Sequence, residues 1–337
     1  MRIESYFSLH LHNSFHLPVH TRWFMEYDSE EELSRILQDD FFQKNCFISI
    51  GEGSNLLFIN EFDGIILHSQ IKGITVADET SDTVLLRIGA AEHWDDVVVY
   101  AITKGLGGIE NLSDIPGTAG AAALQNIGAY GVEIKEVVEK VEAFHPLTGE
   151  KHIFSNEACK YAYRHSFFKE EAEHNPFIIT AILLRLQKTP RYNVAYGHLN
   201  TVLGHQTITL QTLRDAVIAA RRSRLPDPKD LGNAGSFFIN PVIRQEQFND
   251  LKNRYDSIPC YPASEGMVKV PAGWLIEQCG FKGKREGAVG VYEKQALILV
   301  NYGGATGHAI AAFAEKIQQS VEAKFGIHLV PEVKYIY

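Results

Sequence analysis

The chain has 337 residues, of which 45% are hydrophobic and 22% are charged. These values are typical of a globular protein with two or three domains, since one domain takes roughly 100–200 residues. The net charge of −9 argues against a nucleic-acid-binding protein, which would need a large basic face. No apolar run approaches the roughly 18 residues that a membrane span requires, so we expect no membrane partner.

The cysteines and the first residues indicate the compartment. The four cysteines lie far apart and follow no metal-binding spacing, so we interpret them as reduced thiols and expect no metal site. The N-terminus lacks the basic and then apolar pattern of a secretory signal. We therefore expect a cytoplasmic protein, and a monomer because no obvious interface helix stands out.

Short runs rich in β-branched residues predict the strands of the first part of the chain. They lie at 47–50, 64–68, 84–89, 136–145 and 177–186. One helix is expected over 92–104, ending at Gly105. Because strands outnumber helices up to about residue 200, the pattern predicts an α+β unit with largely antiparallel or mixed sheets.

From about residue 212 helices become more frequent. A capping box of Thr212 and Asp215 predicts the start of a helix that continues to Arg224 and ends before Pro226. Further helices are expected at 244–256, 271–279 and 306–325, with strands near 237–243 and 296–301. The pattern of this half of the chain predicts a second domain of a few strands covered by helices.

The segment 48–58 (ISIGEGSNLLF) predicts a strand, a glycine loop and a second apolar run. Gly51 and Gly53 allow successive backbone N–H groups to point into one concavity, which suits a pyrophosphate. Ser54 and Asn55 add neutral donors. The loop is neither a dinucleotide fingerprint nor a P-loop, since the third glycine and the Lys-Ser or Lys-Thr pair are missing.

Residues 114–131 (DIPGTAGAAALQNIGAYG) carry four glycines and five alanines. Such a density of small residues lets the backbone approach a flat or phosphorylated ligand, beside side chains that hydrogen-bond or stack. A tightly packed core turn explains the same composition equally well. The presence of two such loops in one chain favours a bound nucleotide.

Cationic residues occur in two places. Residues 161–168 put Arg164 among aromatic side chains, where a partly desolvated guanidinium would act strongly on a carboxylate. The alternative is a surface arginine whose stem packs on the rings. A second group either draws in an anionic ligand or complements the dipole of a helix end. It consists of Arg221, Arg222, Arg224 and Lys229.

Two further residues could take part in proton chemistry. Ser236 follows Gly235 at the junction of a loop with an expected strand, where a hydroxyl could offer one proton in a fixed direction. A simple turn serine is the alternative. Glu332 lies in an expected apolar strand, where a neutral carboxyl group could donate a hydrogen bond. An ordinary acid of an edge strand is the alternative there.

Taken in chain order, these motifs resemble a known family. The matching segments are 51–55, 115–118, 125–131, 163–164, 225–228, 232–238 and 331–333. Together they are similar to the UDP-N-acetylenolpyruvoylglucosamine reductases (MurB), the flavoproteins of bacterial peptidoglycan synthesis. The resemblance spans about residues 15–337. Each motif is weak by itself, but the ordered set is highly specific.

The resemblance implies an FAD-dependent reaction on a sugar nucleotide. FAD would be bound non-covalently, reduced by NADPH, and would pass a hydride to the enolpyruvyl β carbon. Ser236 would protonate the α carbon, and Arg164 and Glu332 would stabilise the enolate, Glu332 by donating a hydrogen bond while protonated. NADPH is expected to use the cleft of the sugar nucleotide in turn.

The resemblance also implies which residues contact the two ligands. Those for FAD are Gly51, Glu52, Gly53, Ser54, Asn55, Ile115, Pro116, Gly117, Thr118, Gln125, Asn126, Gly128 and Ala129. Those for the substrate are Tyr130, Tyr163, Tyr196, Arg221, Arg224, Asn240 and Gln278. Residues 196–199 resemble the tyrosine loop of the longer, type I form. Arg224 departs from the family pattern, in which lysine is expected.

The implied fold is α+β, with an FAD-binding region of the vanillyl-alcohol oxidase (PCMH) type. It would cover residues 1–211, in subdomains of about 1–67 and 68–211, and the C-terminal strand 328–337 would return to the site. An α+β substrate-binding domain would cover 212–327.

Two other functions stay open at this point. An FAD oxidase that passes electrons to oxygen would share the flavin-binding half, but it would have no reason to keep Ser236, Arg164 and Glu332 together. A non-catalytic nucleotide-binding protein would bind the ligand without turnover.

Overall fold

The computed structural model describes residues 1–171, 176–196, 199–255 and 257–337, which divide into two compact units. Unit 1 comprises Met1–Phe7, His20–Gly53 and Asp63–Ser223. Unit 2 comprises Ser8–Val19, Ser54–Phe62 and Arg224–Tyr337. Each unit is therefore assembled from segments that are distant in the sequence.

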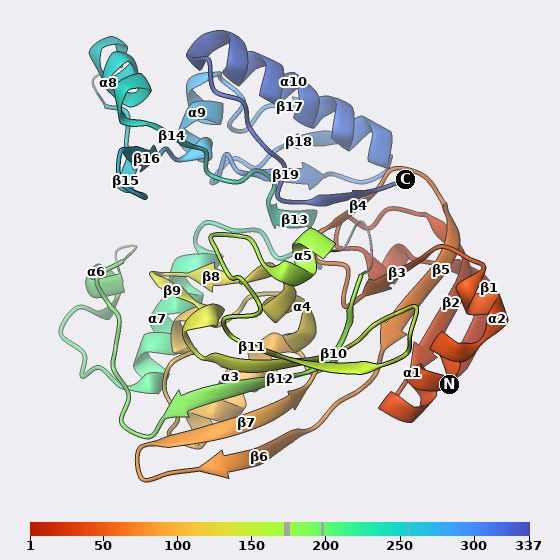
Figure 1. Ribbon diagram of the computed structural model, residues 1–337. Coiled ribbons are helices and arrows are strands. Elements are labelled where there is room, and N and C mark those ends of the chain that lie inside the picture. Colours follow the sequence, from red (N-terminus) through yellow and green to blue (C-terminus); the bar gives the residue numbers. More distant parts are fainter. Residues whose placement is uncertain (172–175, 197–198, 256) are drawn as a thin grey trace. The chain divides into compact units, whose positions relative to one another are not determined.

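Unit 1 contains two main sheets (Figure 1). A four-stranded sheet has the order β1-β2-β5-β3, with β3 and β5 parallel. Its strands are β1 (Arg2–Ser8), β2 (His20–Tyr27), β3 (Phe47–Ile50) and β5 (Phe62–Ser69). A five-stranded antiparallel sheet has the order β11-β10-β12-β7-β6. Its strands are β6 (Ile74–Glu79), β7 (Thr83–Gly89), β10 (Val138–Phe144), β11 (Lys151–Ser155) and β12 (Ile178–Gln187).

The five strands predicted for the first part of the chain are confirmed to within two residues at each end. The predicted helix at 92–104 is also confirmed, as α3 (Trp94–Thr103). Buried side chains of α3 and of α4 (Ala119–Gln125) share one apolar core with β7, β10 and β12. The antiparallel sheet and these two helices thus fix the position of the glycine-rich segment 114–131.

Other short elements complete unit 1. The helices are α1 (Glu30–Gln38), α2 (Asp40–Gln43), α5 (Phe167–Glu171), α6 (Leu199–Leu203) and α7 (Leu210–Arg222). The short strands β8 (Gly128–Ala129) and β9 (Val132–Glu133) form a hairpin directly after α4. The helices α1 and α2 pack on the four-stranded sheet around a second apolar core.

The start and the domain of α7 differ from the prediction. The helix begins at Leu210, because Thr209 and Thr212 cap it reciprocally through their hydroxyl groups. It belongs to unit 1, where Arg214 forms two hydrogen bonds with the carboxylate of Asp95 at 2.7 and 2.6 Å. The division of the chain therefore falls after Ser223 instead of at residue 211.

The described residues of unit 2 form three small sheets and three α-helices (Figure 1). Its four-stranded sheet consists of β13 (Gly232–Ser236), β19 (Ile298–Asn301), β18 (Val289–Val291) and β17 (Arg285–Glu286). The second sheet consists of β14 (Val242–Arg244), β16 (Met267–Lys269) and β15 (Tyr261–Pro262). The third is a parallel pair of β4 (Leu56–Phe58) and β20 (Lys334–Ile336).

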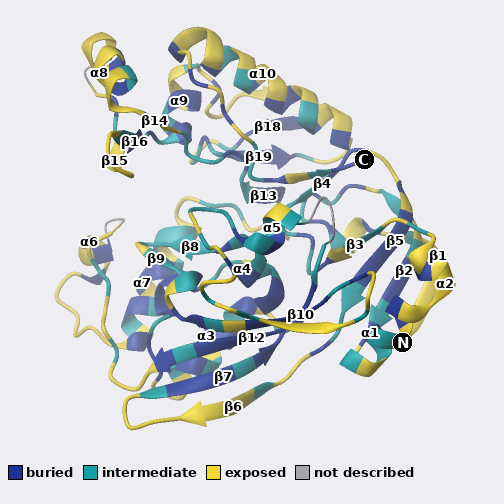
Figure 2. Cartoon of the chain, viewed as in Figure 1, coloured by how far each residue is buried: buried dark blue, intermediate teal, exposed yellow. Residues whose placement is uncertain are grey.

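The helices predicted for unit 2 are confirmed as α8 (Gln245–Arg254), α9 (Ala272–Gln278) and α10 (Gly307–Phe325). Figure 2 shows buried and exposed residues alternating along α10, as expected for an amphipathic helix on a core. Among the described residues, no helix is long and apolar enough to span a bilayer.

Two strand predictions in unit 2 are wrong. Only the last two residues of the strand expected at 237–243 are in a strand: β13 ends at Ser236, and β14 begins at Val242. The sequence of β13 is GNAGS, so its pairing with β19 overrides a poor strand propensity. Glu332 precedes β20 and is not inside that strand.

Candidate active site

The two glycine-rich segments meet inside unit 1. A Cβ atom on Gly51 would lie 2.6 Å from Oγ1 of Thr118, so the close approach requires glycine. The backbone N–H of Gly117 donates to Oε2 of Glu52 at 2.9 Å, and the other carboxylate oxygen of Glu52 pairs with His93. The structure thus joins two segments that were each predicted to contact FAD.

Conformation and close packing require glycine at several positions of these two segments. Gly53 and Gly117 have φ values of +68° and +117°, a conformation that residues with a Cβ rarely adopt. A Cβ atom on Gly120 would lie 2.9 Å from that of Ala90. Larger side chains are therefore disfavoured at these positions.

Several amide groups of segment 114–131 hold the segment itself in place. The N–H groups of Ala119 and Gly120 donate to the carbonyl oxygens of Glu92 and Ala90. That of Gly117 donates to the side-chain carboxylate of Glu52. The side chain of Asn126 is fully buried and donates to Glu133 and to the carbonyl of Ala162. The amide of Asn126, predicted to contact FAD, thus has partners within the protein.

Arg164 is attached to the same segment. Its Nη2 donates to the carbonyl of Gly128 at 3.0 Å, and the guanidinium carbon lies 5.4 Å from the ring centre of Tyr163. The φ of Arg164 is +54°, in the left-handed region that an arginine rarely occupies. The predicted arginine among aromatic rings is therefore held by the backbone of the glycine-rich segment.

In unit 2, the two residues predicted to take part in proton chemistry, Ser236 and Glu332, lie on segments that are hydrogen-bonded to each other. The N–H of Glu332 donates to the carbonyl of Phe237, the residue after Ser236, at 2.8 Å. Asn55, from the first glycine loop, donates through Nδ2 to the carbonyl of Glu332 at 3.1 Å. The tertiary structure therefore brings together three predicted residues from distant parts of the sequence: Asn55, Ser236 and Glu332.

The predicted cationic group divides between the two units. Arg221 lies in unit 1, where its Nε donates to the carbonyl of Asp114 at 3.1 Å and Arg222 pairs with the carboxylate of Asp114 at 3.3 Å. Burial lowers the pKa of Arg221, while the nearby Tyr130 and Asp114 act in the opposite direction. Arg224 and Lys229 are exposed residues of unit 2.

The other predicted substrate contacts have different settings. Asn240 accepts the N–H of Ala272 through Oδ1 at 2.9 Å at the start of α9, and Gln278 is the last residue of that helix. The side chain of Tyr196 is exposed. Residues 197–198 of the predicted tyrosine loop lie outside the described residues.

Sequence patterns did not identify Asn111, which connects the predicted substrate residue Tyr130 with Asn193. Asn111 is buried, and its Nδ2 donates to the carbonyls of Tyr130 and Asn193 at 3.0 and 2.8 Å. Asn193 in turn donates to the carbonyl of Gly131. The available signal was an asparagine between the apolar Ile109 and Leu112.

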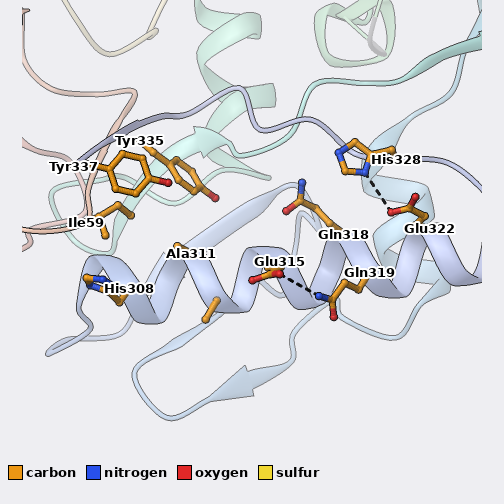
Figure 3. Close-up of a pocket in the computed structure, with 11 residues that line it drawn as sticks. Ile59, His308, Ala311, Glu315, Gln318, Gln319, Glu322, His328, Tyr335 and Tyr337 are labelled. Atoms are coloured by element: carbon orange, nitrogen blue, oxygen red, sulfur yellow. Dashed lines mark hydrogen bonds and ion pairs between the residues drawn. The ribbon is translucent and has the colours of Figure 1, made fainter.

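A surface cavity of about 650 Å³ lies on α10 and the C-terminal strand (Figure 3). Its lining includes His308, Glu315, Glu322, His328 and Tyr335. Two interactions join the residues of this lining, His328 with Glu322 and Gln319 with Glu315. None of the described residues predicted for the site belongs to the lining.

Comparison with known proteins identifies the family. A model of the FAD binding domain matches residues 22–152, and one of the UDP-N-acetylenolpyruvoylglucosamine reductase C-terminal domain matches residues 227–336. A UDP-N-acetylenolpyruvoylglucosamine reductase of Porphyromonas gingivalis is 52% identical over 338 residues, which cover 100% of both chains. The chain belongs to the UDP-N-acetylenolpyruvoylglucosamine reductase family.

Further relatives agree with this result. A UDP-N-acetylenolpyruvoylglucosamine reductase of Bacteroides fragilis is 43% identical over 335 residues, covering 99% of this chain and 100% of that one. The crystal structure of UDP-N-acetylenolpyruvylglucosamine reductase (MurB) from Thermus caldophilus aligns over 100% of both chains, with a TM-score of 0.70 and 20% identity. This similarity supports the fold.

The predicted fold class and cofactor are therefore confirmed. The chain combines a PCMH-type FAD-binding region with an α+β C-terminal domain. As a member of the UDP-N-acetylenolpyruvoylglucosamine reductase family, it is an FAD-dependent oxidoreductase.

Proposed function

We propose that the protein reduces UDP-N-acetylglucosamine enolpyruvate to UDP-N-acetylmuramate with NADPH, in peptidoglycan synthesis. The observation that carries this proposal is the hydrogen bond between the segments of Ser236 and Glu332, at 2.8 Å from the Glu332 N–H to the Phe237 carbonyl. Relatives at 52% and 43% identity, named UDP-N-acetylenolpyruvoylglucosamine reductases, support the choice of substrate.

The two glycine-rich segments would hold FAD non-covalently. Gly51, Gly53 and Gly117 supply backbone without side chains, and their conformations and close contacts fit a bound pyrophosphate and ring. Once bound and reduced by NADPH, FAD supplies a hydride to the β carbon of the enolpyruvyl group. The other residues proposed to line this site are Glu52, Ser54, Asn55, Ile115, Pro116, Thr118, Gln125, Gly128 and Ala129.

Ser236 would supply the proton that completes the reduction. Hydride addition leaves negative charge at the α carbon and on the carboxylate oxygens. The proton of the Ser236 hydroxyl then forms the new C–H bond at the α carbon, and the serine oxygen takes a proton back from water. A carbanion is a much stronger base than the partners that serine meets in hydrolysis, so a neutral hydroxyl is sufficiently acidic.

Arg164 and Glu332 would stabilise the negative charge on the carboxylate oxygens. Groups that are already in position stabilise a developing charge more strongly than groups that must first reorganise. The hydrogen bond of Arg164 to Gly128 and that of Asn55 to Glu332 provide such positioning within each unit. We propose that Arg164 and Glu332 act on the same substrate molecule as Ser236.

Substrate binding would involve cations and aromatic rings. Arg221 lies near Tyr130 and is partly buried, which strengthens its attraction for a diphosphate. The remaining residues proposed to contact the substrate are Tyr163, Tyr196, Arg224, Asn240 and Gln278.

The proposal is tested by measuring the two half-reactions of Ser236→Ala separately, by anaerobic stopped-flow spectroscopy. We expect flavin reduction by NADPH at nearly the wild-type rate, and reoxidation by the enolpyruvyl substrate slower by about 10²–10⁴-fold, the usual contribution of a positioned proton donor. A matched control is Ser320→Ala, whose hydroxyl donates to a helix carbonyl in the same unit.

Two outcomes would contradict the proposal. Equal slowing of both half-reactions would show that Ser236 has no specific role as proton donor. Fast reoxidation of the wild-type protein by oxygen, with slow reoxidation by the enolpyruvyl substrate, would indicate an oxidase.

A further inference from the structure

Segments 124–128 and 162–166 of unit 1 are joined by several hydrogen bonds. Three backbone carbonyls of the first segment, those of Leu124, Asn126 and Gly128, accept from side chains of the second. The donors are Oγ of Ser166 and the two terminal nitrogens of Arg164, the latter at 3.4 and 3.0 Å. The position of Arg164 is thus coupled to the predicted cofactor segment.

Asn126, in the first segment, donates a hydrogen bond to the backbone of the second segment. Its Nδ2 donates to the carbonyl of Ala162 at 2.8 Å and to Oε2 of Glu133 at 3.0 Å, while its Oδ1 accepts the N–H of Lys135 at 3.2 Å. The amide nitrogen of an asparagine has two N–H groups, and both are used here. Because Asn126 is also 0% exposed, its side chain acts within the protein.

Glu133 places a negative charge beside this connection. Its carboxylate accepts from Asn126 and pairs with Lys135 at 2.8 Å. A Cβ atom on Gly128 would lie 3.0 Å from Cγ of Glu133 and 3.3 Å from Nη1 of Arg164, so the acid and the guanidinium flank the same backbone position. Burial raises the pKa of Glu133, but Lys135, Asn126 and Arg164 together outweigh it and lower the pKa.

The turn that carries Arg164 needs such support. Arg164 has a φ of +54°, and Asn126 has a φ of +47° at the C-terminal cap of α4. Non-glycine residues persist in this region only where the surrounding structure holds them. The bond from Asn126 to Ala162 anchors the turn two residues before Arg164.

We propose that Asn126 is a positioning residue for Arg164, with Glu133 as its partner, and that its side chain does not bind FAD. The proposal rests on the role given to Arg164 in the proposed function. Asn126 fixes the turn, Glu133 orients the amide of Asn126, and the carbonyls of residues 126 and 128 orient the guanidinium.

The test is Asn126→Ala in the holoenzyme, with both half-reactions measured separately. We expect FAD affinity and flavin reduction by NADPH within about twofold of wild type. Reoxidation by the enolpyruvyl substrate should slow by about 10–100-fold, the effect of a misplaced reacting group. Asn156→Ala is the matched control, because its amide also donates to two backbone carbonyls of unit 1, those of Lys135 and Val138. It should leave both half-reactions unchanged.

The double variant Asn126→Ala with Arg164→Ala separates positioning from a general structural effect. If Asn126 acts through Arg164, its substitution should slow reoxidation no further once Arg164 is absent. An equal slowing in both backgrounds would overturn the proposal, as would weakened FAD binding in Asn126→Ala. A normal reoxidation rate in Arg164→Ala alone would instead overturn the proposed role of Arg164, and so separates the two failures.

If Asn126→Ala does not fold, Glu133→Gln tests the same connection at constant side-chain size. It removes the charge that faces Asn126 and Lys135, so reoxidation should slow several-fold while flavin reduction by NADPH stays normal. Unchanged reoxidation in Glu133→Gln would exclude Glu133 as the partner and overturn the proposal in this form.

Discussion

At the scale of single residues, the close approach of Gly51 to Thr118 sets a strict requirement. A Cβ atom on residue 51 would lie 2.6 Å from Oγ1 and 3.3 Å from Cγ2 of the threonine. Both atoms belong to a β-branched side chain with few allowed rotamers, so the threonine has little freedom to move away. The glycine loop must therefore shift if residue 51 gains a side chain.

We predict that Gly51→Ala weakens FAD binding and lowers the free energy of unfolding by about 1–3 kcal/mol, as overpacking usually does. Titration of the apoprotein with FAD, followed by flavin fluorescence, measures the binding. In the control Gly51→Ala with Thr118→Ala, the Cβ of residue 118 remains at 3.5 Å, an ordinary van der Waals distance, so stability should return. Wild-type affinity and stability in Gly51→Ala would contradict the prediction.

The ion pair of Asp95 and Arg214 makes the stability of the fold depend on pH. Burial raises the pKa of Asp95, but the hydrogen bonds from Arg214 and from the N–H of Asp114 outweigh burial and lower it. A carboxyl group whose pKa is lower in the folded protein stabilises the fold above its unfolded-state value of about 4. This stabilisation is lost as the pH falls through the folded-state pKa.

We predict that Asp95→Asn lowers the free energy of unfolding at pH 7 by about 1–3 kcal/mol, the usual cost of removing a charged partner. The difference from wild type should shrink at pH 3, because below an unfolded-state pKa of about 4 the unfolded wild-type protein gains a proton at Asp95. Urea denaturation at both pH values measures it. Asp63→Asn breaks an exposed pair with Arg22 and should change stability by less than about 0.5 kcal/mol. A pH-independent difference for Asp95→Asn would argue against this explanation.

At the scale of an element, the first turn of α10 packs directly on backbone. Gly307 is buried, and a Cβ atom there would overlap with the carbonyl oxygen of Phe58 and lie 2.8 Å from Cα of Ile59. Neither atom is the end of a flexible side chain. The helix therefore lies against the segment that contains β4, and a larger residue would separate them.

We predict that Gly307→Ala lowers the free energy of unfolding by about 3 kcal/mol or more, at the upper end of overpacking effects. The gain in helix propensity from glycine to alanine, about 1 kcal/mol, is too small to compensate. Ala312→Gly, at an exposed position of the same helix, serves as control and should cost only about that amount. Equal or greater stability of Gly307→Ala would show that the contact can relax.

At the scale of the whole molecule, the residues proposed to contact the ligands are distributed over both units. Unit 1 contains Gly51, Gly117 and Arg164, while unit 2 contains Ser236 and Glu332. Each unit is stabilised by a core of its own chain segments, and a ligand that binds only the folded protein adds to that stability.

We predict that FAD at about 100 times its Kd raises the free energy of unfolding by about 2.7 kcal/mol. Thermal unfolding of the apoprotein with and without FAD measures the shift. Riboflavin, which lacks the pyrophosphate, should stabilise much less, because the glycine loop is proposed to bind that group. Equal stabilisation by riboflavin would contradict a role for the loop in pyrophosphate binding.

Local sequence patterns predicted the elements more reliably than their boundaries. Strands such as β12 and helices such as α10 have long periodic patterns, and both were predicted to within two residues. β13 was missed because GNAGS has little strand propensity and pairs only through β19. The helix α7 starts two residues before its predicted start, because Thr212 forms its capping box with Thr209 and not with Asp215.

For the candidate site, the sequence indicated the residues but not their partners. The neighbours in the chain distinguished three residues: Ser236, Arg164 and Glu332. The comparison with known proteins confirmed the predicted family. The bonds of Asn126 to Ala162 and Glu133, and those of Asn111 to Tyr130 and Asn193, follow no spacing that a linear pattern reveals.

The sequence by itself predicted the fold class, and its resemblance to a known family indicated the cofactor class. Glycine and alanine at fixed spacings, and apolar residues with a period of two or 3.6, are local properties that can be read directly along the chain. Only the tertiary structure decided which segments meet: Gly51 against Thr118, the Ser236 segment against Glu332, and Arg164 against Gly128. Such contacts arise because each unit buries its apolar surface between segments that are far apart in sequence. Which segments pair therefore depends on the whole chain and not on any local pattern.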